Sequence, residues 1–79
     1  MRWYYHLNER NSRLLIYSYS RETEDLDGLI VFDVEKQTAS VMRPCKNDTG
    51  SKKAQRKAIE HFGTVIEGGF PDDKYVCCG

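Results

Sequence analysis

The chain is short, polar and electrically balanced, and these properties exclude several classes of protein. Its 79 residues suffice for one domain, residues 1–79, with a single small core. Twelve basic and twelve acidic residues give a formal net charge of zero, so overall charge indicates neither a nucleic-acid nor a membrane partner. Aromatic residues make up 11% of the chain, too many for a disordered segment, and no apolar run approaches the roughly 20 residues of a membrane span.

The N-terminal sequence and the cysteines bear on where the protein works. The opening residues 1–6 lack the apolar core of a secretion signal. Three cysteines, Cys45, Cys77 and Cys78, cannot all pair within one molecule. We therefore predict a cytoplasmic protein with reduced thiols.

The first half of the chain predicts four strands. Residues 3–7 are rich in aromatic side chains and form a hairpin with residues 13–20, because both segments flank a cluster of turn formers. The second strand has period two, with Leu15, Tyr17 and Tyr19 on one face and Leu14, Ile16, Ser18 and Ser20 on the other. Residues 29–34 are continuously apolar, which predicts a central strand buried on both faces. Residues 38–42 follow a short turn and complete a second hairpin.

The second half predicts one helix and a final strand. Thr49 or Ser51 is the expected N-cap, and residues 68–71, Gly-Gly-Phe-Pro, end the helix. One helix face is apolar and consists of Ala54, Ala58, Ile59, Phe62, Val65 and Ile66. Residues 74–78 form the last strand, which joins the sheet either at an edge or between the hairpins. The predicted fold is α+β: a single antiparallel sheet, in the element order β-β-β-β-α-β, packed by one amphipathic helix.

The candidates for metal binding and catalysis are weak. The cysteines, with His6 and His61, could supply zinc ligands, but Cys77 and Cys78 are adjacent and would point to opposite faces of a strand. A cysteine with His61 as base has no orienting third group in the sequence. We therefore expect no enzyme, no metal site and no cofactor.

Two oppositely charged segments produce the overall neutrality. Residues 22–35 contain six acidic residues and no basic one. Residues 43–57 contain one acid, Asp48, and six basic residues, which are Arg43, Lys46, Lys52, Lys53, Arg56 and Lys57. Lys52 and Lys53 oppose the positive end of the helix dipole, which suggests a functional reason for their presence.

Aromatic side chains on the first two strands offer a second candidate surface. If Tyr17 and Tyr19 were exposed beside the basic segment, bases could stack on the rings while the cations bound phosphates. If both rings face the helix, they belong to the core. The strand register decides between these alternatives.

Several short segments resemble a known group of proteins: Trp3-Tyr4-Tyr5, residues 7–11, Asp27-Gly28, Gly69-Phe70-Pro71, Tyr75-Val76 and Cys78-Gly79. The chain is similar in these to short uncharacterised proteins of conjugative or other mobile elements in gut Firmicutes. The resemblance implies a stand-alone bacterial protein with an accessory role. It implies no catalytic or binding residue.

These observations favour a small non-enzymatic protein-interaction module. It would present a face or an edge of its sheet to an unknown protein partner, or to a second copy in a weak homodimer. The alternative is single-stranded nucleic-acid binding through the basic helix start and the sheet tyrosines. No membrane partner is expected.

Overall fold

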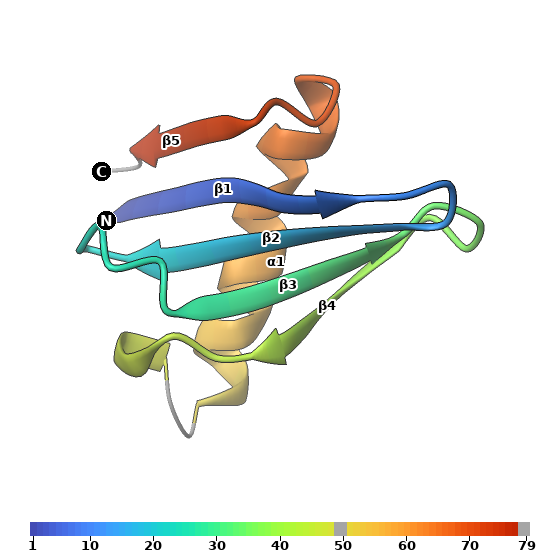
Figure 1. Ribbon diagram of the computed structural model, residues 1–79. Helices are drawn as coiled ribbons and strands as arrows, with labels where there is room; N and C mark the ends of the chain where they lie inside the picture. The colour runs from blue at the N-terminus through green and yellow to red at the C-terminus, as the bar shows by residue number, and fades with distance from the viewer. Residues whose placement is uncertain (49–50, 78–79) are drawn as a thin grey trace.

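The structure is a five-stranded antiparallel sheet with one helix packed across one face (Figure 1). It is a computed structural model that describes residues 1–48 and 51–77. The elements are β1 (Arg2–Arg10), β2 (Leu14–Arg21), β3 (Gly28–Asp33), β4 (Thr38–Arg43), the 3₁₀ turn η1 (Lys46–Asp48), α1 (Lys52–Glu67) and β5 (Asp73–Cys77). The predicted α+β fold and its element order are confirmed.

The strand order in the sheet is β4-β3-β2-β1-β5, and every neighbouring pair is antiparallel. Of the two placements that the sequence left open for the last strand, the structure shows the edge, with Trp3 of β1 opposite Val76 of β5. The other edge strand is β4, which pairs only with β3. The sheet therefore has two unlike edges, one at the end of the second hairpin and one at the end of the chain.

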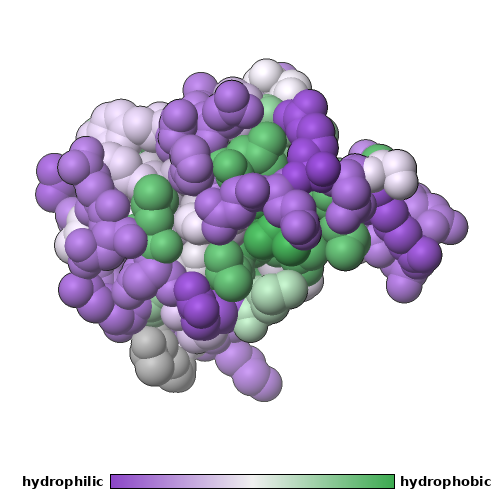
Figure 2. Space-filling view, viewed as in Figure 1, coloured by the Kyte–Doolittle hydropathy of each residue, from purple (hydrophilic) through white to green (hydrophobic). Residues whose placement is uncertain are grey.

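The prediction that residues 29–34 are buried on both faces was wrong. Ile30 and Phe32 are buried on the side of α1, whereas Leu29 and Val31 are only half-buried on the opposite side. That side is covered by no helix of the described chain, and Figure 2 shows apolar atoms gathered at its centre among hydrophilic ones. A continuous apolar run places apolar side chains on both faces of a strand. It does not show that a second layer of structure covers both faces of the sheet.

The core under α1 is unusually aromatic. Trp3, Tyr5, Tyr17 and Tyr19 are all at most 2% exposed and share this face, as the β1–β2 register requires. The Phe62 ring of α1 lies among them, 5.6 Å from the Tyr5 ring and 5.2 Å from the Tyr17 ring. The buried hydroxyls keep hydrogen bonds: Tyr5 donates to the Ala58 carbonyl and Tyr17 to the Pro71 carbonyl. Aromatic rings thus fill a core that has few aliphatic side chains.

The ends of α1 follow the predicted signals. The Ser51 hydroxyl accepts a hydrogen bond from the Ala54 amide, so Ser51 is the N-cap; Thr49 lies outside the described residues. At the C-terminus Gly69 adopts a φ of 79°, and the Phe70 amide donates to the Val65 carbonyl. Figure 1 shows the helix beginning beyond β4 and crossing the strands towards β5. Among the described residues no helix is long and apolar enough to cross a membrane.

Candidate functional site

The six predicted basic residues do not form one surface, because the first two lie against the acidic loop between β2 and β3. Lys46 Nζ is 2.8 Å from a carboxylate oxygen of Asp25, and the Arg43 guanidinium donates to the Asp27 carbonyl. The ion pair lowers the pKa of Asp25 and raises that of Lys46. Arg43 and Lys46 are thus engaged within the molecule by the oppositely charged segment.

The other four basic residues are exposed on α1 and divide into two rows. Lys52 and Arg56 are four residues apart and lie beside β4. Lys53 and Lys57 have the same spacing but lie on the side of Trp3 and Arg21. Residues three and four apart on a helix are neighbours, so Lys52 and Arg56 form one row, Lys53 and Lys57 form another, and the two rows adjoin where Lys53 and Arg56 are three apart.

The first row borders a groove between β4 and the start of α1. It has a volume of about 630 Å³ and is lined by Ala39, Ser40, Val41, Lys52, Gln55, Arg56 and Ile59. Its lining therefore combines three apolar side chains, two cations and no acid. Because the first turns of α1 extend past β4 (Figure 1), the helix overhangs the edge of the sheet at this place.

The strand beside this groove has the features of an unprotected edge. β4 is hydrogen-bonded to β3 alone, so the outward half of its backbone donors and acceptors has no ladder partner in the sheet. Residues 38–42 contain neither a charged residue nor a proline, which are two means of blocking an edge, whereas β4 ends at the charged Arg43 and Pro44 follows it. At Met42, which is 57% exposed, the register shifts opposite Leu29 and Ile30; because such an irregularity helps to protect an edge, the unprotected part of β4 is residues 38–41.

The second row, Lys53 and Lys57, borders a smaller hollow of about 280 Å³ beside Trp3 and Arg21. The sequence did not single out Arg21. Its guanidinium lies 2.6 Å from a carboxylate oxygen of the fully buried Asp48 and 5.9 Å from the centre of the Trp3 ring. Arg21 and Asp48 therefore tie η1 to β2, and the one acid of the basic segment is a structural residue.

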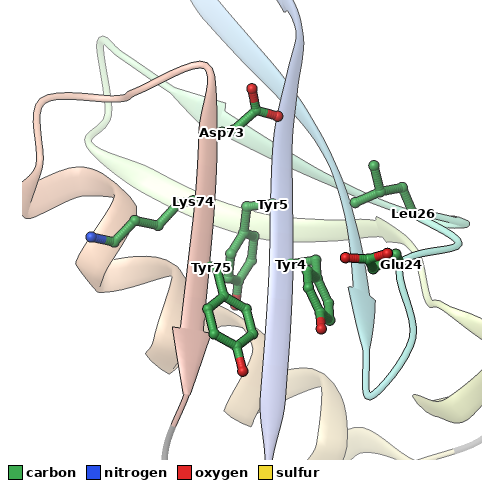
Figure 3. A pocket seen from close by; sticks show the side chains of 7 residues that line it. All are labelled: Tyr4, Tyr5, Glu24, Leu26, Asp73, Lys74 and Tyr75. Carbon is green, nitrogen blue, oxygen red and sulfur yellow. The ribbon is translucent and has the colours of Figure 1, made fainter.

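A third hollow lies on the open face of the sheet near β5 (Figure 3). The Tyr4 and Tyr75 rings lie 5.0 Å apart across β1 and β5, with Leu26 and Glu24 of the β2–β3 loop beside Tyr4. Lys74 points away from these side chains in Figure 3. Among the described residues, the lining of this hollow is mainly aromatic, with the Glu24 carboxylate at its border and with Lys74, whose side chain points away from the rings.

The tyrosines proposed for base stacking are not at the surface. Tyr17 and Tyr19 are both 0% exposed beneath α1. Desolvation raises the pKa of Tyr17 to about 12 and that of Tyr19 further. Both rings therefore belong to the core, the second of the two alternatives that the register had to decide.

The cysteines and histidines are dispersed. Cys45 is buried, Cys77 is exposed on β5, and Cys78 lies outside the described residues. The His61 ring packs 5.4 Å from the Trp3 ring, whereas His6 lies 2.6 Å from Asp73 between β1 and β5. Within residues 1–48 and 51–77 no three metal-ligating side chains gather at one point.

The sequence predicted Lys52 and Arg56 as binding residues, and they line the β4 groove, but it did not predict the groove itself. The signal was present in part: an uncharged run at residues 38–42 and two cations four residues apart. The position of α1 over that strand could not be derived from either. No protein-family model, no curated protein and no solved structure matches the chain.

Proposed function

We propose that the protein is a non-enzymatic protein-interaction module that binds an extended segment of a partner protein as an additional strand along β4. The observation that supports this most is the coincidence, on the same edge, of a groove and a strand that is uncharged over residues 38–42. In strand addition, backbone hydrogen bonds supply affinity, and pockets for alternate side chains supply specificity. β4 offers backbone groups for hydrogen bonding, and the groove between β4 and α1 offers pockets for side chains.

The alternative surfaces fit partner binding less well. The open sheet face is apolar only at its centre, and nothing in the structure indicates what would cover it. At β5 the edge begins with Asp73 and Lys74, and charged side chains oppose pairing with another strand.

Single-stranded nucleic acid also fits less well than a protein segment. Its stacking residues would be Tyr17 and Tyr19, which are buried, and two of its six cations are engaged with the acidic loop. Binding without stacking would rest on the exposed lysines and Arg56 alone, an interaction without sequence information. We place the interaction in the cytoplasm, where Cys45 and Cys77 would remain reduced.

The test uses two short probe peptides in which every second residue is threonine. The residues between the threonines are valine and glutamate in one probe, and valine and glutamine in the other. Each is also made with N-methyl groups on one or the other alternate set of its amides. A strand uses only one alternate set of its amides to pair with a single neighbour. Fluorescence anisotropy with labelled peptide measures the affinity of each form.

We expect at least one probe to bind, N-methylation of one set of amides to abolish binding, and N-methylation of the other set to leave it within about twofold. If neither probe binds, or if both sets weaken binding equally, strand addition is contradicted.

A further inference from the structure

We propose that the β4 groove selects an acidic segment: one that places a carboxylate against Lys52 and Arg56 and small apolar side chains against Ala39, Val41 and Ile59. This inference rests on the proposed function, because it specifies which extended segments can add to β4. It follows from the charge around the groove, its lining, and the surfaces that a second copy of the chain would present.

Several cations of the chain already have an acidic partner within the molecule. Arg13 lies 3.6 Å from Glu35, Arg21 2.6 Å from Asp48 and Lys46 2.8 Å from Asp25. Among the described residues, no such ion pair includes Lys52 or Arg56. Both side chains are exposed, and no acid lines their groove. The groove is thus positive and its charge is not neutralised from within.

The helix adds to this positive potential. Lys52 is the first residue of α1, and the first turn contains no acidic side chain. The amino end of a helix carries a partial positive charge that favours anions within about one turn. Placing cations there costs helix stability, and a bound carboxylate would relieve that cost. The positive charge of the helix start therefore favours a negatively charged ligand.

The residues that line the groove determine which apolar side chains of a ligand it can accept. An added strand would lie about 4.8 Å from β4 and send every second side chain towards α1. On that side β4 presents the short side chains of Ala39 and Val41, and α1 presents Ile59. Because α1 crosses the strands and overhangs only part of β4, this contact spans a few residues of the ligand (Figure 1). A segment with small apolar side chains beside one acid satisfies the groove.

The same charges disfavour a second copy of the chain as the ligand. If β5 of another copy added to β4, its helix-side residues would be Val76 and Lys74, because these pair with the buried Trp3 and Tyr5. Lys74 would then approach the cations of the groove. If β4 paired with β4 of a second copy across a two-fold axis, Lys52 and Arg56 of one copy would face Lys52 and Arg56 of the other. Like charges at short range oppose both arrangements, so the favoured occupant is an acidic segment of a different protein.

The helix itself supplies a matched control. The double variant Lys52→Gln, Arg56→Gln removes the two cations of the groove. The double variant Lys53→Gln, Lys57→Gln removes two cations with the same spacing on the neighbouring helix row, and it changes net charge equally. Both sets are exposed, so both variants should fold, which thermal melting checks.

Affinities are measured for the glutamate probe, for the glutamine probe and for a single-stranded oligonucleotide. We expect the glutamate probe to bind about tenfold tighter than the glutamine probe, and the Lys52/Arg56 variant to abolish that difference. The Lys53/Lys57 variant should retain it within about twofold. The oligonucleotide should not displace the bound peptide.

Each way in which the proposal can fail gives a different result. Equal binding of both probes overturns selection for an acid but leaves strand addition intact. Equal weakening by the two double variants shows a general attraction to the basic helix and overturns the groove as its source. Displacement by the oligonucleotide overturns the protein segment as ligand, and absence of binding by both probes contradicts the proposed function itself.

Discussion

The two edges of the sheet differ in charge, in protection and in the end of the helix that lies nearest. At β4 the strand is uncharged over residues 38–42 and meets the start of α1, with Lys52 and Arg56. At β5 the strand begins with Asp73 and Lys74 and lies near the helix end, where Glu67 is the last residue. Over residues 38–42 the β4 edge therefore carries no charge of its own and adjoins a positive groove, whereas the β5 edge begins with two charged residues.

The charges at the two ends of α1 oppose the helix dipole. α1 has no acid in its first turn and no base in its last turn, the reverse of the arrangement that stabilises helices. Stability alone would favour the opposite distribution. The reversed charges place a positive potential at the β4 edge, where we propose that a partner strand adds.

The largest effect on stability is expected where the chain packs closely at the β4 side of the helix. A methyl group at Gly28 would lie 2.4 Å from the buried Tyr19 ring and 2.8 Å from the Cys45 backbone nitrogen. Gly28→Ala should lower the free energy of unfolding by about 1–3 kcal/mol, because neither neighbour can move freely. Urea denaturation measures this, and an unchanged midpoint would contradict the close packing of this side.

The next largest effect is on binding affinity, and it compares the β4 edge with the β5 edge. Ala39→Glu places a carboxylate in the β4 groove, where it would pair with its cations and repel an acidic ligand. The glutamate probe should bind at least tenfold more weakly, which is about 1.4 kcal/mol. Tyr75→Glu, at a side chain 51% exposed on β5, is the control and should leave affinity unchanged. If Tyr75→Glu is the harmful change, the ligand uses the other edge.

A smaller effect of opposite sign is expected further along α1. A methyl group at Gly63 would meet no atom within 4 Å. Gly63→Ala should raise the free energy of unfolding by about 0.5–1 kcal/mol, because alanine loses less backbone entropy in a helix. Destabilisation in the same urea experiment would show that this part of the helix is packed as closely as the Gly28 region.

Replacing a lysine at the start of α1 by glutamate should have a still smaller effect on stability. This change also distinguishes an effect on stability from an effect on binding. Lys52→Glu and Lys53→Glu should each stabilise the protein by about 0.3–1 kcal/mol, because each favours the helix dipole. Only Lys52→Glu should weaken binding of the glutamate probe, since only Lys52 lines the groove. Equal effects of both variants on binding would contradict the division of the helix into two rows.

The smallest effect is a pH dependence at the β4 side. The Lys46 ammonium holds the pKa of Asp25 below its usual range, so this pair stabilises the fold above that range and loses its contribution as the pH falls. Unfolding measured between roughly pH 5 and pH 2 should show a shallower decline in Asp25→Asn than in the unaltered protein. Parallel curves would mean that the pair contributes nothing.

The fold was predictable because its local signals agree with one another. The alternation in β2, the cap at Ser51 and the stop at Gly69 each depend on a few neighbouring residues, and each is found in the structure. The edge position of β5 was not predictable, since it depends on pairing with β1 some 70 residues away in sequence, between Arg2 and Cys77 for example.

The candidate site was predictable only in its residue types. Arg43, Lys46, Lys52 and Arg56 read alike in sequence, yet the first two meet acidic-loop residues 16 to 21 positions away in the chain. The Arg21–Asp48 contact joins residues 27 apart. Which cations remain available is therefore decided by tertiary contacts, and the groove exists only because α1 crosses β4 at its start.

Strand addition at β4 is tested most directly by residue-resolved amide hydrogen exchange by NMR, with and without saturating glutamate probe. An added strand would protect outward amides within residues 38–41, which lack a ladder partner in the protein alone. We predict slowed exchange at these amides and unchanged exchange along β5. New protection confined to β5, or to the open face around Leu29 and Val31, would contradict strand addition at β4.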